Sequence, residues 1–551
     1  MQPETVRAGT LKLFRQTLSR VGENLRVFRE DRAPLMWVLA LGIGIGTGLA
    51  AVAFRYGIGV VQWLWAGTSS EFNLAALAAL PWWALFLAPV AGGVAVGLLN
   101  QFLLEGRRPG AVADVIQARI EGGRGLGFRN GLWTAVVAAI SLGSGASAGR
   151  EGPVVHLGGT IALSVTRFFA MDEAGRRILL GCGVAGAISA SFNAPIAGVL
   201  FAHEVILGHY AMRAFVPIVI ASMSGSVVNR VLIGETAAFE IPAYAIGSYL
   251  ELPAFVLLGV TAAAVAILFQ FLLIFCDQTA RSIVMPTWAR PVAGGVVLGS
   301  IGIFFPEVLG VGYGATDRAL NQGYAAETMV TLLVVKMVAT AITLASRFGG
   351  GIFSPSLYLG AMVGGAFGVI ATSVFPDISS DHGLYAMLGM GAVAAAMLGA
   401  PLSTTMIVFE LTGGYALSIA LLVTVAIATS LHHAVHGKSF FQWQLDVRGV
   451  IEGHHYFMRT VRAVSIMTPV QRPPSGEGAA AEPEPPPAEN EAFLRPADNL
   501  ERILRLFNET GRDVLPVREG KDLVRVGTVS HVQALRALNS RLIAQSHEEH
   551  H

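Results

Sequence analysis

One acidic residue, Glu151, lies in a long stretch of small and apolar residues, where a charge is costly. Between residues 131 and 170 the other charged side chains are Arg150 and Arg167. An ionisable side chain within a membrane segment is a candidate functional group. A salt bridge to Arg150 is disfavoured, because adjacent residues of a helix do not face each other. We therefore expect Glu151 to have a functional role: next to an anion site, its carboxylate would compete with the anion and would leave when it is protonated or displaced.

Two glycine-proline motifs share the frame GxxxPxxxLG, GREGPVVHLG at 149–158 and GIFSPSLYLG at 351–360. Proline is favoured at the first helical position, so the motifs predict helices that begin at Pro153 and Pro355. The unpaired amides of a first turn carry the positive end of the helix dipole and suit an anion. Two facing ends would hold one weakly hydrated halide without the full charge that would trap it. The alternative is that the motifs are packing kinks.

A second pair of motifs indicates an internal repeat. Pro195 precedes Glu204 by nine residues, and Pro401 precedes Glu410 by the same interval, with an offset of 206 residues; the first pair is offset by 202. Repeated halves joined through interrupted helices are typical of transporters that bind substrate between the repeats. The sequence therefore predicts two related halves around one site.

The composition places these motifs in lipid. The 551 residues are 53% hydrophobic and 14% charged, which effectively excludes a soluble enzyme, and the net charge of +1 gives no indication of a nucleic-acid partner. Glycine, proline and serine interrupt the apolar runs near 143–153, 191–198, 346–355 and 399–404. Irregular backbone at membrane depth is tolerated where it is buried or lines a wet cavity. The predicted membrane segments are 35–62, 76–104, 130–168, 178–234, 253–276, 291–305, 328–343, 351–375 and 385–431.

Charge and proline content give the predicted domain limits. Residues 1–34 hold seven basic and four acidic side chains and no removable signal peptide, which predicts a cytoplasmic N-terminus. Residues 35–460 form the predicted membrane domain, in which Cys182 and Cys276 are ordinary buried thiols. A small α/β module is predicted at 461–541, with a disordered proline-rich insert at 471–492 and a tail at 542–551.

Within this module we expect an opening strand at Val464–Val470 and a helix that carries Leu500, Ile503, Leu504 and Phe507 behind an Asp498 cap. Two strands, Val514–Val517 and Leu523–Val529, flank a turn at Gly520, and a second helix starts from Ser530.

The motifs GSGASAGREGP, FNAPIAGVLF, GGGIFSPSLYLGA and APLSTTMIVFELT, taken in order, resemble the signatures of the chloride-channel (CLC) family of channels and proton-coupled exchangers. The resemblance implies an α-helical polytopic membrane protein of two inverted halves, a homodimer with one anion pathway per subunit, and a cytoplasmic CBS-like module. It implies a cell (inner) membrane location with both termini cytoplasmic. Glu151 would be the gate, between Arg150 and Gly152, and the amides of Ile352 and Phe353 would coordinate the central anion.

Two positions near the expected anion sites depart from the family pattern. The segment that contacts the anion is assigned to residues 108–112, where Pro109 replaces a serine and Gly110 follows it. Family members with proline there tend toward nitrate, so the resemblance implies chloride or nitrate as substrate. The tyrosine that closes the inner site corresponds to Phe441, which keeps the ring and loses the hydroxyl donor.

A third departure concerns protons. Exchangers of the family typically carry an inner glutamate one residue after Glu204, and this chain has Val205 there. Glu204 cannot replace it, because one residue is a rotation of about 100° along a helix. His203 is an alternative proton carrier, since imidazole titrates near neutrality. For both residues a helix-end or subunit-contact role is the alternative. We favour a channel gated by Glu151 and keep the proton-coupled antiporter as the alternative.

The sequence favours no cofactor. The CBS-like module is a single copy that could pair across the dimer, and Ser530–Gln533 lacks the aspartate of the usual nucleotide pattern, which favours a dimer contact over nucleotide binding. His203-Glu204 begins like the HExxH metalloenzyme motif, but its second histidine is replaced by Leu207. His432, His433 and His436 share a helical face, and for them we expect polar capping rather than a metal.

Overall fold

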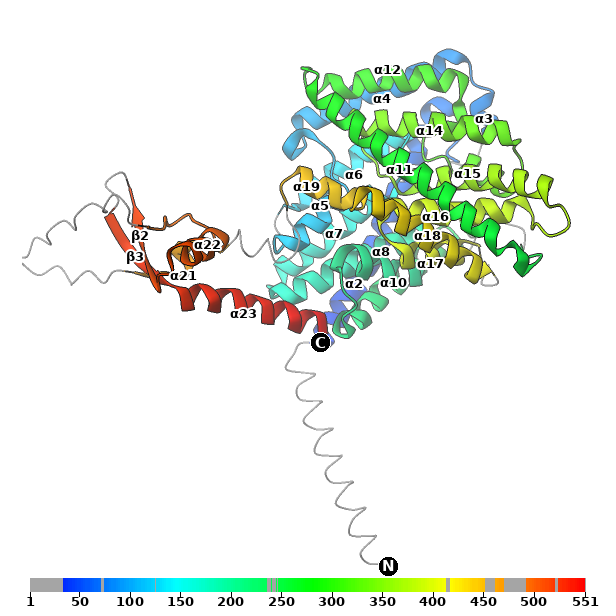
Figure 1. Ribbon diagram of the computed structural model, residues 1–551. Helices are drawn as coiled ribbons and strands as arrows, with labels where there is room; N and C mark the ends of the chain where they lie inside the picture. The colour runs from blue at the N-terminus through cyan, green and yellow to red at the C-terminus, as the bar shows by residue number, and fades with distance from the viewer. Residues whose placement is uncertain are drawn as a thin grey trace, which may run out of the picture. The chain divides into compact units, whose positions relative to one another are not determined.

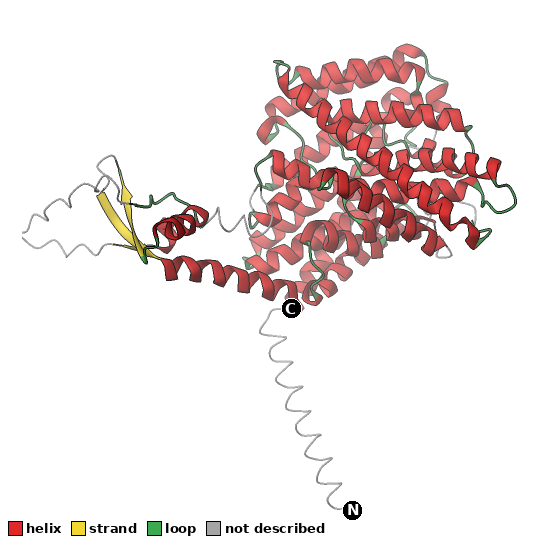
Figure 2. Cartoon of the chain, in the orientation of Figure 1, coloured by secondary structure: helices red, strands yellow, loops and turns green. Residues whose placement is uncertain are grey.

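The computed structural model describes residues 33–70, 74–123, 125–234, 239, 244, 246–412, 417–450, 461–469, 492–520 and 524–550. The chain divides into two compact units, Met1–Gln444 and Leu445–His551, so this division precedes the predicted boundary at residue 460. Figure 1 traces the elements of both units, and Figure 2 shows that the first is helical and that the strands belong to the second. Residues 1–32 of the predicted N-terminal segment lie outside the described residues. Residues 471–491 of the predicted proline-rich insert also lie outside them.

The helices of the first unit form two series with the same order. The first series is α2 (Ala33–Ala66), α4 (Trp82–Phe102), α5 (Val112–Ile120), α6 (Phe128–Gly143), α7 (Glu151–Phe168), α8 (Glu173–Phe192), α9 (Pro195–Phe201) and α10 (Met212–Leu232). The second is α11 (Leu252–Ser282), α12 (Ala289–Phe304), α13 (Tyr313–Leu320), α14 (Ala326–Ala345), α15 (Phe353–Val374), α16 (His382–Leu398), α17 (Pro401–Thr412) and α18 (Ser418–His436). The short helix α3 (Leu74–Ala78) also belongs to this unit, and α19 (Phe440–Val447) begins in it.

Seven helical stretches among the described residues are long and apolar enough to cross a membrane: Ala33–Ala66, Trp82–Phe102, Met212–Leu232, Leu252–Ser282, Ala326–Ala345, Phe353–Val374 and Ser418–Val447, the last of which contains α18 and α19. Others are too short to do so; α5, α9 and α13 have nine, seven and eight residues. The predicted class, an α-helical polytopic membrane protein of two halves with broken helices, is confirmed.

The predicted interruptions follow from backbone chemistry. Asn193 caps the end of α8 and Gly399 caps the end of α16, and both residues are left-handed, with φ of 57° and 66°. Asparagine and glycine tolerate this conformation, and a proline two residues later begins the next helix. The same residue types therefore end one helix and begin the next at equivalent places in the two halves.

Close glycine contacts also repeat. A Cβ atom on Gly158 of α7 would collide with the carbonyl oxygen of Gly183 on α8, and one on Gly360 of α15 would collide with that of Gly389 on α16. Small residues allow helix backbones to approach closely in membranes, where packing rather than hydrophobic exclusion holds helices together. These contacts fix α7 and α15, whose first residues face the candidate site.

The second unit contains α21 (Ala463–Ile466), β1 (Thr468–Pro469), α22 (Leu500–Thr510), β2 (Val514–Glu519), β3 (Val524–Ser530) and α23 (His531–His550). The strands form an antiparallel sheet of order β1-β3-β2. Its core joins Leu500, Ile503 and Phe507 of α22 to Leu515 and Val529 of the sheet. The two predicted strands around Gly520 and the predicted helices are therefore present.

Two predictions for this unit were wrong in detail, and the predicted tail, for which no secondary structure was predicted, is helical. The expected strand at Val464–Val470 begins inside the short helix α21, which ends at Ile466, and among its described residues the strand β1 contains Thr468 and Pro469. The cap of α22 is Asn499, whose side chain accepts a hydrogen bond from the amide of Arg502, rather than Asp498. The predicted tail at 542–551 continues α23 as far as His550. Neighbouring Asp and Asn are both good caps, so the sequence does not distinguish them.

Candidate functional site: a buried cavity at four helix ends

The two glycine-proline motifs meet through their backbones. Gly149 donates to the carbonyl of Gly351 at 2.7 Å and accepts from the amide of Gly351 at 2.8 Å, which forms an isolated antiparallel bridge. Reciprocal contacts between equivalent residues are the property of a twofold relation. The bridge therefore joins the two halves at the points where α7 and α15 begin.

Both helices start two residues before the positions predicted from their prolines. Helix α7 begins at Glu151 and α15 begins at Phe353, so Pro153 and Pro355 occupy the third position of each first turn. A proline is tolerated throughout the first turn, because the amides there have no partner within the helix. The prediction of a start at each proline was wrong, and Glu151 and Phe353 themselves are the first helical residues.

Glu151 is buried, with 1% of its surface exposed, and both carboxylate oxygens accept hydrogen bonds from hydroxyl groups. The hydroxyl of Tyr313, the first residue of α13, donates to Oε1 at 2.7 Å. The hydroxyl of Ser354, in the first turn of α15, donates to Oε2 at 2.6 Å. The carboxylate therefore lies between the two halves of the protein and is bonded to elements of the second half.

Arg150 lies beside this carboxylate. Its Nε is 3.9 Å from Oε1 of Glu151, its Nη2 donates to the carbonyl of Ser191 at 3.0 Å, and its guanidinium lies 4.8 Å from the centre of the Tyr313 ring. The prediction that a salt bridge between Arg150 and Glu151 is disfavoured was wrong, because Arg150 is the N-cap of α7 rather than a residue within the helix. The Arg150 charge thus offsets part of the cost of burying an ionised Glu151.

A cavity of about 30 Å³ lies at the ends of four helices. This exceeds the roughly 10–15 Å³ needed to hold one water-sized occupant. Its lining includes Glu151 and Gly152 at the start of α7, Ile352 and Phe353 at the start of α15, and Phe441 at the start of α19. Val112, the first residue of α5, also lines it. Four positive helix ends and mostly apolar walls favour a small anion.

The segment assigned to the inner anion contact leads into this cavity. Ala111 and Val112 line it, whereas Pro109 and Gly110 are outside the described lining. The amide of Gly110 donates to the hydroxyl of Thr134 at 3.3 Å, and a Cβ on Gly110 would collide with the His156 ring.

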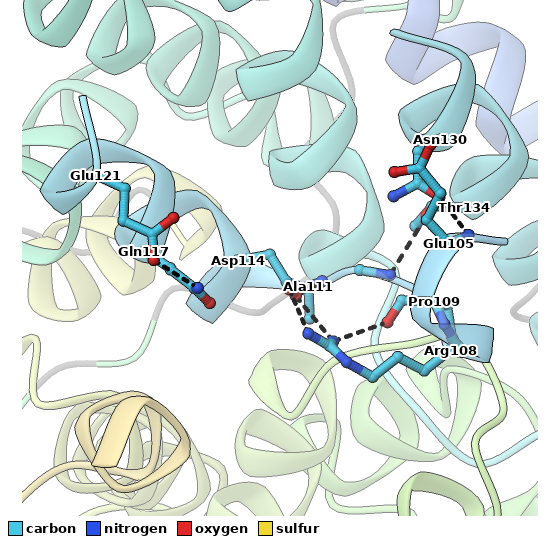
Figure 3. Close-up of polar contacts among 10 residues, drawn as sticks. Glu105, Arg108, Pro109, Ala111, Asp114, Gln117, Glu121, Asn130 and Thr134 are labelled. Atoms are coloured by element: carbon cyan, nitrogen blue, oxygen red, sulfur yellow. Dashed lines mark hydrogen bonds and ion pairs between the residues drawn. The ribbon is translucent and has the colours of Figure 1, made fainter. Parts of the chain in front are cut away.

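A carboxylate caps the helix that follows this segment. Asp114 accepts from the amide of Ala111 at 2.8 Å and pairs with Arg108 at 2.7 Å, and Figure 3 shows Arg108 reaching both Asp114 and the Pro109 carbonyl. The start of α5 is therefore held by side chains from its own loop and first turn.

The three residues of the expected proton path lie elsewhere, in a π-helical turn, Ala202–Leu207, that follows α9. The carboxylate of Glu204 accepts hydrogen bonds from amides at the start of α17. His203 is buried, and its Nδ1 is 3.0 Å from the carbonyl of His209. Val205 is half-buried in the same turn. The carboxylate of Glu204 thus contacts a helix end. A helix-end role was the alternative to proton transfer for this residue.

The histidines at the end of α18 also have protein contacts. The Nε2 of His436 lies 3.2 Å from the carbonyl of Ile267 on α11, and the rings of His432 and His436 are 5.0 Å apart. Among the residues that the structure describes, no group of three His, Cys, Asp or Glu side chains could hold a metal ion. The end of α18 is capped by Gly437, whose φ is 68°. The expected capping by histidine was therefore wrong for His436, which contacts another helix.

The fold and the cavity define a class: a polytopic membrane protein whose broken helices direct their amino-terminal ends to one buried cavity. The chain belongs to the voltage gated chloride channel family, whose model matches residues 92–433. It is similar to a ClcB-like chloride channel protein of Ralstonia nicotianae, with 30% identity over 385 residues, 69% of this chain and 90% of that protein.

Two further comparisons agree on the family and the fold. The H+/Cl− exchange transporter ClcA of Vibrio cholerae is 30% identical over 344 residues, 61% of this chain and 70% of that protein. The crystal structure of a slow cyanobacterial Cl−/H+ antiporter matches with a TM-score of 0.68 and 24% identity, over 75% of this chain and 97% of that one. The CLC resemblance of the motifs is thus confirmed, and the protein is a multi-pass membrane protein of a family that transports anions.

Proposed function

We propose that this protein conducts chloride or nitrate across the membrane through the cavity between α7 and α15, as a channel gated by Glu151. The observation that carries the proposal is the position of Glu151: it begins α7, lines the cavity, and lies beside the first residues of α15. Unpaired amides at both ends supply partial positive charge in a water-poor site, where electrostatic interactions are strong.

The backbone amides of Ile352 and Phe353 are the proposed central ligands, with Gly152 on the opposite helix end and the Phe441 ring closing the inner side. These four residues all line the cavity. Arg150 acts in this proposal from outside the lining, through its charge. Pro109 and Gly110 act by shaping the loop that delivers Ala111 and Val112 to the cavity.

Channel conduction rather than exchange is supported by Val205, which cannot carry a proton where exchangers have glutamate. The second candidate is a proton-coupled antiporter, and it is favoured by the similarity of the chain to ClcA, an H+/Cl− exchange transporter. In that case His203, which is buried and titratable, is the group that we propose for the proton path.

Reconstituted vesicles distinguish the two candidates. A chloride gradient is imposed across vesicles that contain the protein, and internal pH is followed with the membrane potential clamped by valinomycin and potassium. A channel dissipates the chloride gradient with no uphill proton movement. Proton uptake driven at a fixed ratio to chloride would instead establish the antiporter.

The gate is tested by Glu151→Gln, which removes the charge and nearly keeps the shape. We expect fast anion flux that no longer depends on pH, because the neutral amide resembles the protonated carboxyl. If the anion flux of Glu151→Gln depends on pH as strongly as that of the unmodified protein, Glu151 is not the gate.

The assembly and location are proposed from the family resemblance and the charge of the N-terminal segment. We propose a homodimer in the cell (inner) membrane with cytoplasmic termini and with CBS-like modules paired across the dimer. In the module, Ser530 and Gln533 form a reciprocal cap at the start of α23, in which each amide bonds the other's side chain, at 2.8 and 3.1 Å. This engagement of the Ser530–Gln533 segment supports a structural role over nucleotide binding.

A further inference from the structure

The two hydroxyl groups on the Glu151 carboxylate belong to residues outside the proposed anion ligands. Tyr313 and Ser354, here called the hydroxyl pair, each donate to a different carboxylate oxygen. Their own oxygens are 3.4 Å apart. We propose that Tyr313 is a positioning residue of the gate: its hydroxyl, together with that of Ser354, holds the ionised carboxylate in the closed position and so sets the pH at which the gate opens. This inference rests on the proposed role of Glu151.

Tyr313 is rigidly placed for this task. Its side chain is 2% exposed, and its ring packs edge-on against Phe239 at 5.4 Å and beneath the Arg150 guanidinium at 4.8 Å. Gly312 precedes it with φ of 92°, a conformation that favours glycine. A Cβ on Gly312 would lie 2.8 Å from the ring of Tyr358, so the turn into α13 has no space for a side chain.

A buried lysine fixes the loop before this turn. Lys336 of α14 donates to the carbonyls of Val308 and Gly310, at 2.9 and 3.0 Å, and its Nζ lies 5.1 Å from the centre of the Tyr358 ring. These bonds hold the loop that ends at Tyr313, and with it the direction in which the hydroxyl points. A side chain that is held by its surroundings loses little entropy when it binds the carboxylate.

The hydroxyl pair distinguishes the two forms of the carboxyl group. An ionised carboxylate accepts from both hydroxyls at once, in charge-assisted bonds about twice as strong as neutral ones. A protonated carboxyl group has no negative charge and one of its oxygens becomes a hydroxyl, a weaker acceptor, so both bonds lose their charge assistance. The pair therefore favours the ionised, closed gate.

Two basic side chains lie near the gate and near the turn that carries Tyr313. The Nε of Arg150 lies 3.9 Å from Oε1 of Glu151. The Nζ of Lys336, on α14, lies next to Gly312 in the turn before Tyr313. Among the described residues, α8 contributes the Ser191 carbonyl to the Arg150 guanidinium, and α15 contributes Ser354. Both side chains remain in place when the tyrosine hydroxyl is removed, so the effect of that hydroxyl can be measured separately.

The test is the pH profile of anion flux in vesicles with Tyr313→Phe, which keeps the ring and removes the hydroxyl. We expect the midpoint of acid activation to rise by about one to two pH units, which corresponds to roughly a tenfold to hundredfold weaker closed state. Ser354→Ala should shift the midpoint in the same direction. Tyr358→Phe is the matched control, because its buried hydroxyl has no hydrogen-bond partner among the described residues.

The same measurement in a Glu151→Gln background separates this inference from the gate itself. If Tyr313 acts through the ionised carboxylate, Tyr313→Phe adds no pH dependence to Glu151→Gln. A midpoint unchanged in both Tyr313→Phe and Ser354→Ala, with pH dependence abolished by Glu151→Gln, would overturn the inference and leave the gate intact. Persistent pH dependence in Glu151→Gln would overturn the gate. If Tyr313→Phe does not fold, Ser354→Ala tests the hydroxyl pair, and an unchanged midpoint in Ser354→Ala would then overturn the inference.

Discussion

Glu204 and Glu410 each cap the helix that begins in the other half. Glu204 accepts from the amides of Leu402 and Ser403 at the start of α17, at 3.1 and 2.7 Å. Glu410 accepts from the amides of Ile196 and Ala197 at the start of α9, at 3.0 and 2.7 Å. A carboxylate at a helix N-terminus satisfies unpaired donors and complements the dipole. The equal spacing of proline and glutamate in the two repeats is therefore explained by this exchange of caps.

Loss of either cap should destabilise the protein similarly. We expect Glu204→Ala and Glu410→Ala each to lower the free energy of unfolding by about 1 kcal/mol, measured as the shift in thermal or denaturant midpoint in detergent. Glu204→Gln keeps one acceptor and should cost less. A large loss for one glutamate with none for the other would contradict the reciprocal role.

The same variants separate a structural role of Glu204 from proton transfer. If Glu204 is a cap, Glu204→Gln leaves anion flux and any proton movement at the level of the unmodified protein. A loss of proton movement with unchanged chloride flux would instead assign it to a proton path.

Gly149 has no space for a side chain beside the gate. A Cβ there would lie 2.7 Å from Oε2 of Glu151 and 3.0 Å from the amide of Ser354. We expect Gly149→Ala to open the bridge to Gly351, to lower the free energy of unfolding by roughly 1–3 kcal/mol, and to alter the pH profile of flux.

Gly42 provides the control for this variant. It lies in α2, and a Cβ there meets nothing within 4 Å. Gly42→Ala should be neutral or slightly stabilising, because alanine is the better helix former. Equal effects of Gly42→Ala and Gly149→Ala would show that the bridge is not the cause.

Pro109 is expected to influence which anion passes. Pro109→Ser restores the hydroxyl that the family pattern places near the anion, so chloride flux should rise relative to nitrate flux in the same vesicles. Fluoride flux measured in parallel tests whether the substitution changes the flux of other anions as well. An unchanged ratio of chloride to nitrate would indicate that Pro109 does not set selectivity, in agreement with its position outside the described cavity lining.

Local sequence signals predicted the breaks in the helices well. Glycine and asparagine tolerate a left-handed φ angle and proline fixes its own φ angle, so these residue types end or begin helices. The ends of α8 and α16 could therefore be located from residue types alone. The first residues of α7 and α15 could not, because proline is tolerated at several positions of a first turn. The repeat spacing predicted the two halves because equivalent chemistry recurs at fixed intervals.

Contacts between distant segments were missed. Tyr313 lies 162 residues from Glu151 and in none of the recognised motifs. One signal could have found it: Tyr313 begins α13 as Val112 begins α5, and the two helices are equivalent in the order of the halves. Comparing the second half with residues 108–112 would have directed attention to residues 309–313. The hydroxyl bond itself depends on tertiary placement, which spacing does not give.

The central claim is that opposed helix ends hold the permeating anion beside Glu151, and anomalous X-ray scattering from bromide tests it most directly. In crystals of Glu151→Gln grown with bromide in place of chloride, we predict an anomalous peak in the cavity, within hydrogen-bond distance of the amides of Ile352 and Phe353. Bromide peaks elsewhere along the protein, with none between α7 and α15 in a variant that still conducts bromide, would contradict the claim.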